Sequence, residues 1–314
     1  MKLFTAFFKV IRWPNLAFIA ITQLLFYYCI IIPIFNREGL TLSPLNESKL
    51  ALIILSSVLI AAAGYIINDY FDINIDLINK PEKNVVDRIM SRRWAMFWHM
   101  FFSMSGIVIG FYVDYISGKF LLGFTNVICV FLLFVYSMTF KKRLLIGNVM
   151  ISLLTGWVVF VVGIYAVIDL LFTPEIHHGL VSRILRLTVL YTAFAFIISL
   201  IREVIKDMED IEGDRRYACR TMPIVWGIHA TKVFTAVWLV VITVSLIAVQ
   251  VYVLIFGWWW SALYVLLLIV APLVLVLKKL KAAKTTADFH FLSTLVKLIM
   301  FTGICSIIFF KWYL

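Results

Sequence analysis

Residues 68 to 76 read Asn-Asp-Tyr-Phe-Asp-Ile-Asn-Ile-Asp and close an apolar run that should lie inside a membrane. Asp69, Asp72 and Asp76 stand at positions i, i+3 and i+7, so a helix would carry all three carboxylates on one face. A carboxylate near bilayer depth costs a few kcal/mol unless something neutralises it. Only 17 of the 314 residues are Asp or Glu, so composition alone does not explain three of them here.

The same spacing occurs a second time, at Asp207, Asp210 and Asp214, after another apolar run. Segments 69 to 87 and 203 to 214 together hold eleven of the 17 acidic residues, mixed with Lys and Arg. A solvated connector with surface ion pairs could have this composition, but two copies of one spacing at equivalent places favour a site. Carboxylate oxygens suit Mg²⁺, and cations beside them suit phosphate. We therefore expect two facing carboxylate trios that form a magnesium site.

The composition indicates a polytopic membrane protein rather than a soluble domain, with 63% hydrophobic residues, 14% charged residues and a mean hydropathy of +1.02. The net charge of +11 would suggest nucleic acid in a soluble chain, but here it is better explained by topology, and we expect no nucleic-acid partner. The four cysteines are far apart in the sequence and form no C-x2-C motif, so neither a disulfide framework nor a zinc site is expected.

Apolar runs predict an all-α chain with nine transmembrane helices. The first twelve residues are read as a short basic and apolar leader before a retained first span, because the run that follows is too long for a signal peptide. Spans two and six each end in a carboxylate trio, which favours two pseudo-repeated four-helix bundles plus one helix, in a single domain of residues 1–314. The predicted spans are 14–35, 50–69, 95–113, 119–139, 148–171, 184–205, 232–256, 259–277 and 293–313, with a tight turn near Gly257 between the seventh and the eighth.

The distribution of Lys and Arg predicts the orientation, since the cytoplasmic side of a membrane protein carries the excess. On the nine-span reading, 22 of the 28 Lys and Arg residues fall on the side of both carboxylate trios. We therefore expect an integral protein of a bacterial or archaeal cytoplasmic membrane, with its active site facing the cytoplasm.

The motifs Asn68-Asp69-x2-Asp72-x3-Asp76 and Asp207-x2-Asp210-x3-Asp214, after the second and sixth of nine spans, resemble the two signatures of the UbiA superfamily of intramembrane prenyltransferases. The resemblance covers the whole chain. It extends to Arg12-Trp13-Pro14-Asn15, Asn79-Lys80-Pro81, Arg88, and Tyr136-Ser137 with Lys141. Within the superfamily, the segment from Arg202 to Asp214 looks most like the digeranylgeranylglyceryl phosphate synthase branch.

This resemblance implies Mg²⁺-dependent transfer of an isoprenyl group from a prenyl diphosphate to a lipid-like or aromatic acceptor. Mg²⁺ between carboxylates and phosphate oxygens would stabilise the leaving group. Tyr136 would face the allylic cation in a dry cavity. Asn68 either orients a carboxylate or a metal-bound water, or caps the helix end. We expect Asp69, Asp72, Asp207 and Asp210 as direct ligands, Asp76 and Asp214 in support, diphosphate contacts from Lys141, Arg88 and Lys206, and further substrate contacts from Asn15 and Arg202.

Other protein classes remain open at this point. A cation-coupled transporter would place its acids near the middle of a span, whereas these cluster at cytoplasmic ends beside Lys and Arg. A structural membrane protein needs no such site, and the Gly-containing motif of CDP-alcohol transferases is absent from the sequence. Among acceptors, a prenylglyceryl phosphate is favoured over an aromatic acid or quinone precursor, and the acceptor phosphate would need cations of its own.

Overall fold

The structure is a computed structural model that describes residues 2–39, 45–79, 86, 90–168, 170–171 and 178–313. For residues 2–4, 76 and 178 it describes the backbone alone. Arg88 therefore lies outside the described residues, as does the side chain of Asp76. The described part of the chain is helical, and its one extended feature is an isolated β-bridge between Val86 and Met90.

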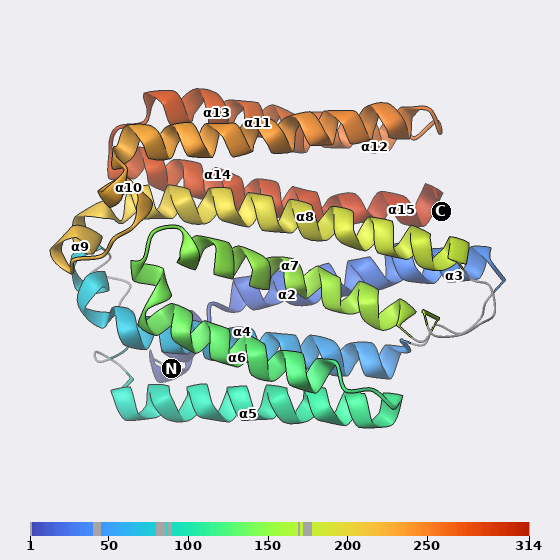
Figure 1. Ribbon diagram of the computed structural model, residues 1–314, viewed down its shortest axis with the longest axis horizontal. Coiled ribbons are helices and arrows are strands. Elements are labelled where there is room, and N and C mark those ends of the chain that lie inside the picture. Colours follow the sequence, from blue (N-terminus) through green and yellow to red (C-terminus); the bar gives the residue numbers. More distant parts are fainter. Residues whose placement is uncertain are drawn as a thin grey trace.

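The helices run roughly along the long axis of the molecule (Figure 1). In chain order they are α1 Lys2–Val10, α2 Trp13–Phe26, η1 Tyr27–Ile31, α3 Ile32–Arg37, α4 Glu47–Asn79, α5 Arg92–Ser117, α6 Leu122–Met138, η2 Phe140–Lys142, α7 Ile146–Val167, α8 His178–Glu209, α9 Ile211–Arg216, α10 Met222–Val225, α11 Gly227–Leu254, α12 Trp259–Val265, η3 Leu266–Val270, α13 Ala271–Ala282, α14 Thr286–Cys305, η4 Ser306–Phe309 and α15 Phe310–Tyr313.

Eight helical segments of the described residues are long and apolar enough to cross a membrane. The predicted fourth span corresponds to α6, which at 17 residues is shorter than these eight. The predicted turn between spans seven and eight is confirmed, because α11 ends at Leu254 and Gly257 takes a left-handed backbone with φ 77°. The length and apolar composition of these helices therefore indicate a polytopic membrane protein.

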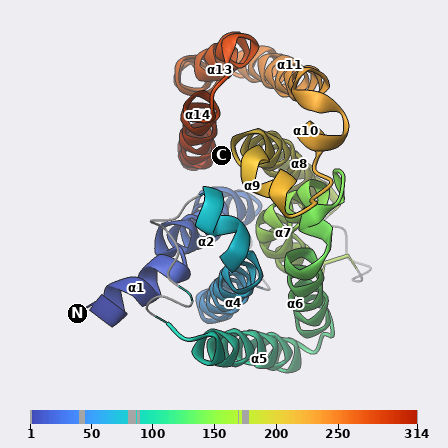
Figure 2. The same ribbon diagram turned by 90° about the vertical axis from the view of Figure 1, so that its left-hand side faces the viewer.

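Seen end-on, the long helices form a bundle (Figure 2). Helices α2 and α14 lie on one side of it and α6 and α7 on the other, while α5 packs outside α4 and α6. Short helices α9 and α10 lie at the end of the bundle where α4 ends, and α9 contacts α4. Both carboxylate motifs are therefore at the same end of the molecule.

Close packing between α4, α5 and α6 depends on small and polar residues. A Cβ on Gly106 would come within 2.7 Å of the Ile60 side chain, so only glycine lets α5 approach α4 this closely. The Ser56 hydroxyl donates to the Gly106 carbonyl at 2.8 Å, and Asn126 of α6 donates to both residues, at 2.8 Å and 3.1 Å. Such interhelical hydrogen bonds hold helices together where lipid supplies no hydrophobic driving force.

Two helices contain a π-helical turn followed by proline. The turn at Tyr27–Ile31 precedes Pro33, and the turn at Leu266–Val270 precedes Pro272. Proline has no N–H and its ring collides with the preceding turn, so a locally widened helix accommodates it. Each span continues through its proline as one membrane-length segment.

The two carboxylate motifs differ in backbone structure. The first is helical throughout, because α4 continues to Asn79. The second is not one helical face: Asp207 lies in the last turn of α8, which ends at Glu209, Asp210 sits at the break with φ −95° and ψ 8°, and Asp214 belongs to α9. Equal spacing in the sequence therefore gives two different local geometries.

Candidate functional site

A cavity of about 910 Å³ runs through the helix bundle and is lined by α2, α4, α6, α7, α8, α11 and α14. One end is polar and holds side chains of both carboxylate motifs. Further along α2, α7 and α8, away from the motifs, its walls include Ile19, Leu154, Trp157 and Phe194. A volume of this size is typical of ligand sites. The cavity can hold a molecule with an anionic head and an apolar tail.

The first motif presents Asp69 and Asp72 to the polar end, and both carboxylates are held by cations from distant segments. Arg12 donates to Asp69 at 2.7 Å. Lys141 makes an ion pair with Asp72, which is only 1% exposed and also accepts from Asn68 at 2.8 Å. Asn68 lies three turns before the end of α4, so it orients a carboxylate and the helix-capping alternative is wrong.

Arg12 occupies an unusual backbone conformation at the junction of α1 and α2. It is the N-cap of α2 with φ 51° and ψ 52°, a left-handed region that non-glycine residues rarely adopt. Its guanidinium lies 5.0 Å from the centre of the Tyr65 ring. Burial acts to lower the pKa of Arg12, but the charges of Asp69 and Tyr65 outweigh it and raise that pKa. Arg12 thus stays cationic at the mouth of the cavity.

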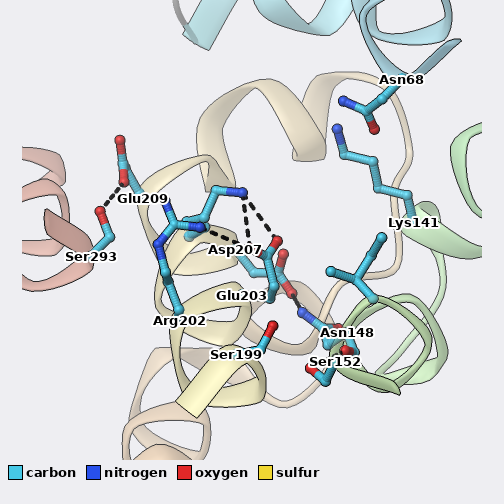
Figure 3. Close-up of polar contacts among 12 residues, drawn as sticks. Asn68, Lys141, Asn148, Ser152, Ser199, Arg202, Glu203, Asp207, Glu209 and Ser293 are labelled. Atoms are coloured by element: carbon cyan, nitrogen blue, oxygen red, sulfur yellow. Dashed lines mark hydrogen bonds and ion pairs between the residues drawn. The ribbon is translucent and has the colours of Figure 1, made fainter. Parts of the chain in front are cut away.

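The second motif contributes Asp207, which accepts from Asn148 of α7 at 2.8 Å. One turn earlier on α8, Glu203 accepts from Arg202 at 3.2 Å and from Lys206 at 3.0 Å (Figure 3). A charge this deep is tolerable only when paired. Glu203 therefore holds two cations in place along the wall of the cavity.

One side chain ties the two motifs together. Asn79, the last residue of α4, donates to the Asp210 carbonyl at 3.1 Å and accepts from the Gly213 N–H at 2.8 Å. A Cβ on Gly213 would lie 2.5 Å from the Asn79 side chain, so this approach requires glycine. The bridge fixes the second motif against the end of the first.

The electrostatics of Asp214 show that both motifs share one environment. Burial raises the pKa of Asp214 to about 6; the positive charge of Lys141 works against that rise, while the carboxylates of Asp210 and Asp72 add to it. Carboxylates from both motifs therefore repel one another across the polar end. An added cation would relieve this repulsion.

The donor atoms at this end suit a hard divalent cation. Two buried oxygens of α4, Asn68 Oδ1 and Asp72 Oδ1, have no hydrogen-bond partner. An unsatisfied buried oxygen is costly unless a ligand occupies it. Within the described residues, no three His, Cys, Asp or Glu side chains converge to hold an ion by themselves. Mg²⁺ commonly completes its shell with water and substrate phosphate, so the residues present fit the ion together with a phosphorylated ligand.

The cavity is lined by every predicted site residue whose side chain the structure describes: Asn15, Asn68, Asp69, Asp72, Tyr136, Lys141, Arg202, Lys206, Asp207, Asp210 and Asp214. The cavity is also lined by Glu203, Asn148 and Lys297, which were not among the predicted site residues. Lys297 could have been recognised from the sequence as a candidate site residue, because it is a lone cation inside an apolar run. Asn148 could not have been recognised in this way, because its partner Asp207 is 59 residues away in the sequence.

A second group of polar residues, centred on Glu209, was also not predicted from the sequence. Glu209 is 8% exposed and bonded by His290 at 2.8 Å and by Ser293 at 3.1 Å, which fastens α14 to the end of α8 (Figure 3). Further along, Lys297 donates to Asn15 at 2.9 Å. Helix α14 is therefore anchored to α8 and to α2 beside the motifs.

The fold and this cavity define an integral membrane protein with a charged site at one end of its helix bundle. The chain belongs to the UbiA prenyltransferase family, whose model matches residues 14–302. The expected resemblance is thereby confirmed.

Similar proteins include two archaeal digeranylgeranylglyceryl phosphate synthases. The one from Methanothermobacter thermautotrophicus is 33% identical over 196 residues, which cover 62% of each chain. The one from Methanosphaera stadtmanae is 32% identical over 208 residues, which cover 65% of this chain and 68% of the relative. The chain thus matches a little under two thirds of the first relative's length.

Solved structures share the fold. A structure of digeranylgeranylglyceryl phosphate synthase in membranes covers 98% of this chain and 99% of its own, with a TM-score of 0.61 at 22% identity. A UbiA homologue from Archaeoglobus fulgidus bound to GPP and Mg²⁺ covers 96% of this chain and 99% of its own, with a TM-score of 0.56 at 13% identity. At these identities the similarity is one of fold.

Proposed function

We propose that this chain is a membrane prenyltransferase that moves an isoprenyl group, geranylgeranyl in the favoured case, from a prenyl diphosphate to the hydroxyl of a prenylglyceryl phosphate. The observation that carries the proposal is the cavity in which carboxylates and cations of both motifs meet at one end and apolar walls continue from it. Family membership supports the reaction, and the named relatives support the acceptor class. Nothing in these similarities supports a transporter.

The polar end would hold the donor diphosphate. We assign direct Mg²⁺ contacts to Asp69, Asp72, Asp207 and Asp210, with Asp76 and Asp214 in support; a homologue bound to GPP and Mg²⁺ supports the choice of ion and of a diphosphate ligand. When bound, Mg²⁺ neutralises the charge that develops on the departing diphosphate. Lys141, Lys206 and Arg88 add positive charge for the same group.

The transfer itself exchanges one carbon–oxygen bond for another. The bond between C1 of the prenyl chain and its diphosphate oxygen breaks, and the electron pair leaves with the diphosphate. The acceptor hydroxyl oxygen gives an electron pair to C1, forms an ether and loses its proton, for which the released diphosphate is a base formed in the same step. The protein's part is to position both substrates and to stabilise charge.

The apolar part of the cavity would hold the prenyl tail and exclude water from the allylic cation. Tyr136, Trp157, Tyr191 and Phe194 line it. Aromatic faces stabilise a nearby cation without supplying a nucleophile. Tyr136 is closest in sequence to Lys141, so we assign it to the reacting end of the chain.

We further propose nine membrane crossings in one domain of residues 1–314, arranged as two related four-helix bundles plus one helix. The 17 residues of α6 would be the additional crossing. At 1.5 Å per residue it spans about 25 Å, which a locally thinned bilayer accommodates. The excess of Lys and Arg near both motifs supports a cytoplasmic active site.

The test is acceptor choice by the purified protein in lipid nanodiscs, with labelled geranylgeranyl diphosphate as donor. We expect a labelled ether product with prenylglyceryl phosphate, and none when Mg²⁺ is chelated. Turnover of 4-hydroxybenzoate or a quinone precursor with none of the glyceryl phosphate would replace the acceptor assignment. Ion flux in liposomes without prenyl transfer would overturn the enzyme itself.

A further inference from the structure

Lys297 is a cation inside a membrane span with no carboxylate partner among the described residues. It lies about three turns beyond the first residue of α14, is partly buried and lines the cavity. Its ammonium donates to the amide oxygen of Asn15, which carries no charge. An intramembrane lysine is costly unless an anion accompanies it. Because no described carboxylate pairs with the Lys297 ammonium, we infer that an anionic ligand does.

Two arginines belong to the same wall of the cavity. Arg12 and Arg202 line the same cavity as Lys297, and their positive charges act on it. The Nε of Arg202 is buried and has no hydrogen-bond partner, so a donor is left open beside Lys297. We call Arg12, Asn15, Arg202 and Lys297 the Lys297 cluster.

The cluster carries more positive charge than its carboxylates balance. Asp69 pairs with Arg12, but Glu203 is shared between Arg202 and Lys206, and Lys297 adds a charge that no described carboxylate meets. A phosphate monoester carries about −1.5 to −2 charges near neutral pH and accepts several hydrogen bonds. Its three oxygens match the arginine, lysine and amide donors gathered here.

Within this cluster, Lys297 and Asn15 come from helices other than those that carry the residues assigned to the diphosphate. Lys141 comes from the turn between α6 and α7, whereas Asn15 and Lys297 come from α2 and α14 on the other side of the bundle (Figure 2). Close up, Arg202 and Lys141 lie on opposite sides of Glu203 and Asp207 (Figure 3). Two anions could therefore bind at once.

We propose that the Lys297 cluster binds the phosphate monoester of the acceptor lipid, with its glycerol hydroxyl directed at the donor's C1. This inference rests on the proposed function, since it names where the second substrate is held. It also gives a reason for the left-handed backbone at Arg12. That conformation turns the guanidinium back over Tyr65 and Asp69 toward the cavity.

The experiment compares wild type, Lys297→Gln, Lys297→Arg and a control, Lys279→Gln, each with both substrates varied. Lys279 is a lysine of α13 that lies 4.8 Å from the Phe291 ring and does not line the cavity. We expect Lys297→Gln to raise the acceptor KM at least tenfold and to change the donor KM less than twofold. Lys297→Arg should restore most of the loss, and Lys279→Gln should match wild type.

A binding measurement separates this inference from the proposed reaction. Inorganic phosphate should compete with the acceptor but not with the donor in wild type, and should raise the thermal stability of wild type more than that of Lys297→Gln. Competition with the donor alone, an increase in donor KM alone, or unchanged kinetics in Lys297→Gln would overturn the cluster assignment. Absence of prenyl transfer in wild type would count against the reaction, while phosphate stabilisation would still test the cluster.

Discussion

Asn79→Ala should separate the two carboxylate motifs without removing a carboxylate. The change deletes two hydrogen bonds, to the Asp210 carbonyl at 3.1 Å and from the Gly213 N–H at 2.8 Å. At about 0.5–1.5 kcal/mol for each bond, the bridge contributes about 1–3 kcal/mol. If that energy holds the motifs at the spacing the donor needs, kcat/KM for the donor should fall about 5- to 150-fold.

The assay is a titration of donor and Mg²⁺ with purified protein. Asn79→Ala should require more Mg²⁺ for half-maximal rate, because the ligands from the two motifs are no longer held together. Gly213→Ala should reproduce the effect, since its Cβ would lie 2.5 Å from the Asn79 side chain and displace it.

The matched control is Asn46→Ala. Asn46 bonds the Lys49 N–H at 2.9 Å at the opposite end of the same helix, so its loss removes a cap far from the site. It should lower thermal stability and leave the Mg²⁺ requirement unchanged. Wild-type donor kinetics and Mg²⁺ dependence in Asn79→Ala would refute the bridge as a positioning device.

Three further predictions concern the metal and the membrane. Asp72→Ala and Asp210→Ala should each reduce turnover by orders of magnitude while the protein remains monodisperse in detergent; near-normal turnover in either would refute a site built from both motifs. Calorimetry should detect Mg²⁺ binding to wild type more tightly with a non-hydrolysable donor analogue than alone, and equal affinities would contradict a shared ligand shell. Cysteines placed at Glu212 and at Phe120 should react from the cytoplasmic and the outer side respectively, and the reverse labelling would invert the topology.

Local spacing predicted the first motif correctly because one helix carries it. Asp69 and Asp72 both reach the cavity from α4, as the i, i+3 relation requires. The same reasoning fails for the second motif, since α8 ends at Glu209 and the chain turns at Asp210. The backbone at that break is bonded to Asn79, 131 residues away, and no local sequence pattern contains this contact.

Long-range pairing explains most of what the sequence left out. Asn15 and Lys297 are 282 residues apart, and Lys141 and Asp72 are 69 apart. Periodicity identifies the helices and the charge distribution orients them, but neither says which helices face each other across a cavity. Lys297 is the exception. A lone lysine in an apolar run costs free energy in a membrane, so it can be recognised as a candidate site residue even when its partner is not known.

The pairing of the motif carboxylates bears on the order in which ligands bind. Arg12 holds Asp69 and Lys141 holds Asp72, so each carboxylate already has a cation when no substrate is present. A metal ion arriving alone must compete with these ion pairs in a poorly solvated site, where breaking one without replacement is costly. A diphosphate arriving with Mg²⁺ offers the displaced Lys141 a new anionic partner, and the acceptor phosphate proposed above offers one to Arg12, so the total number of paired charges is preserved. Donor and metal should therefore bind as one unit, and the protein cations pass from carboxylate to phosphate as the site fills.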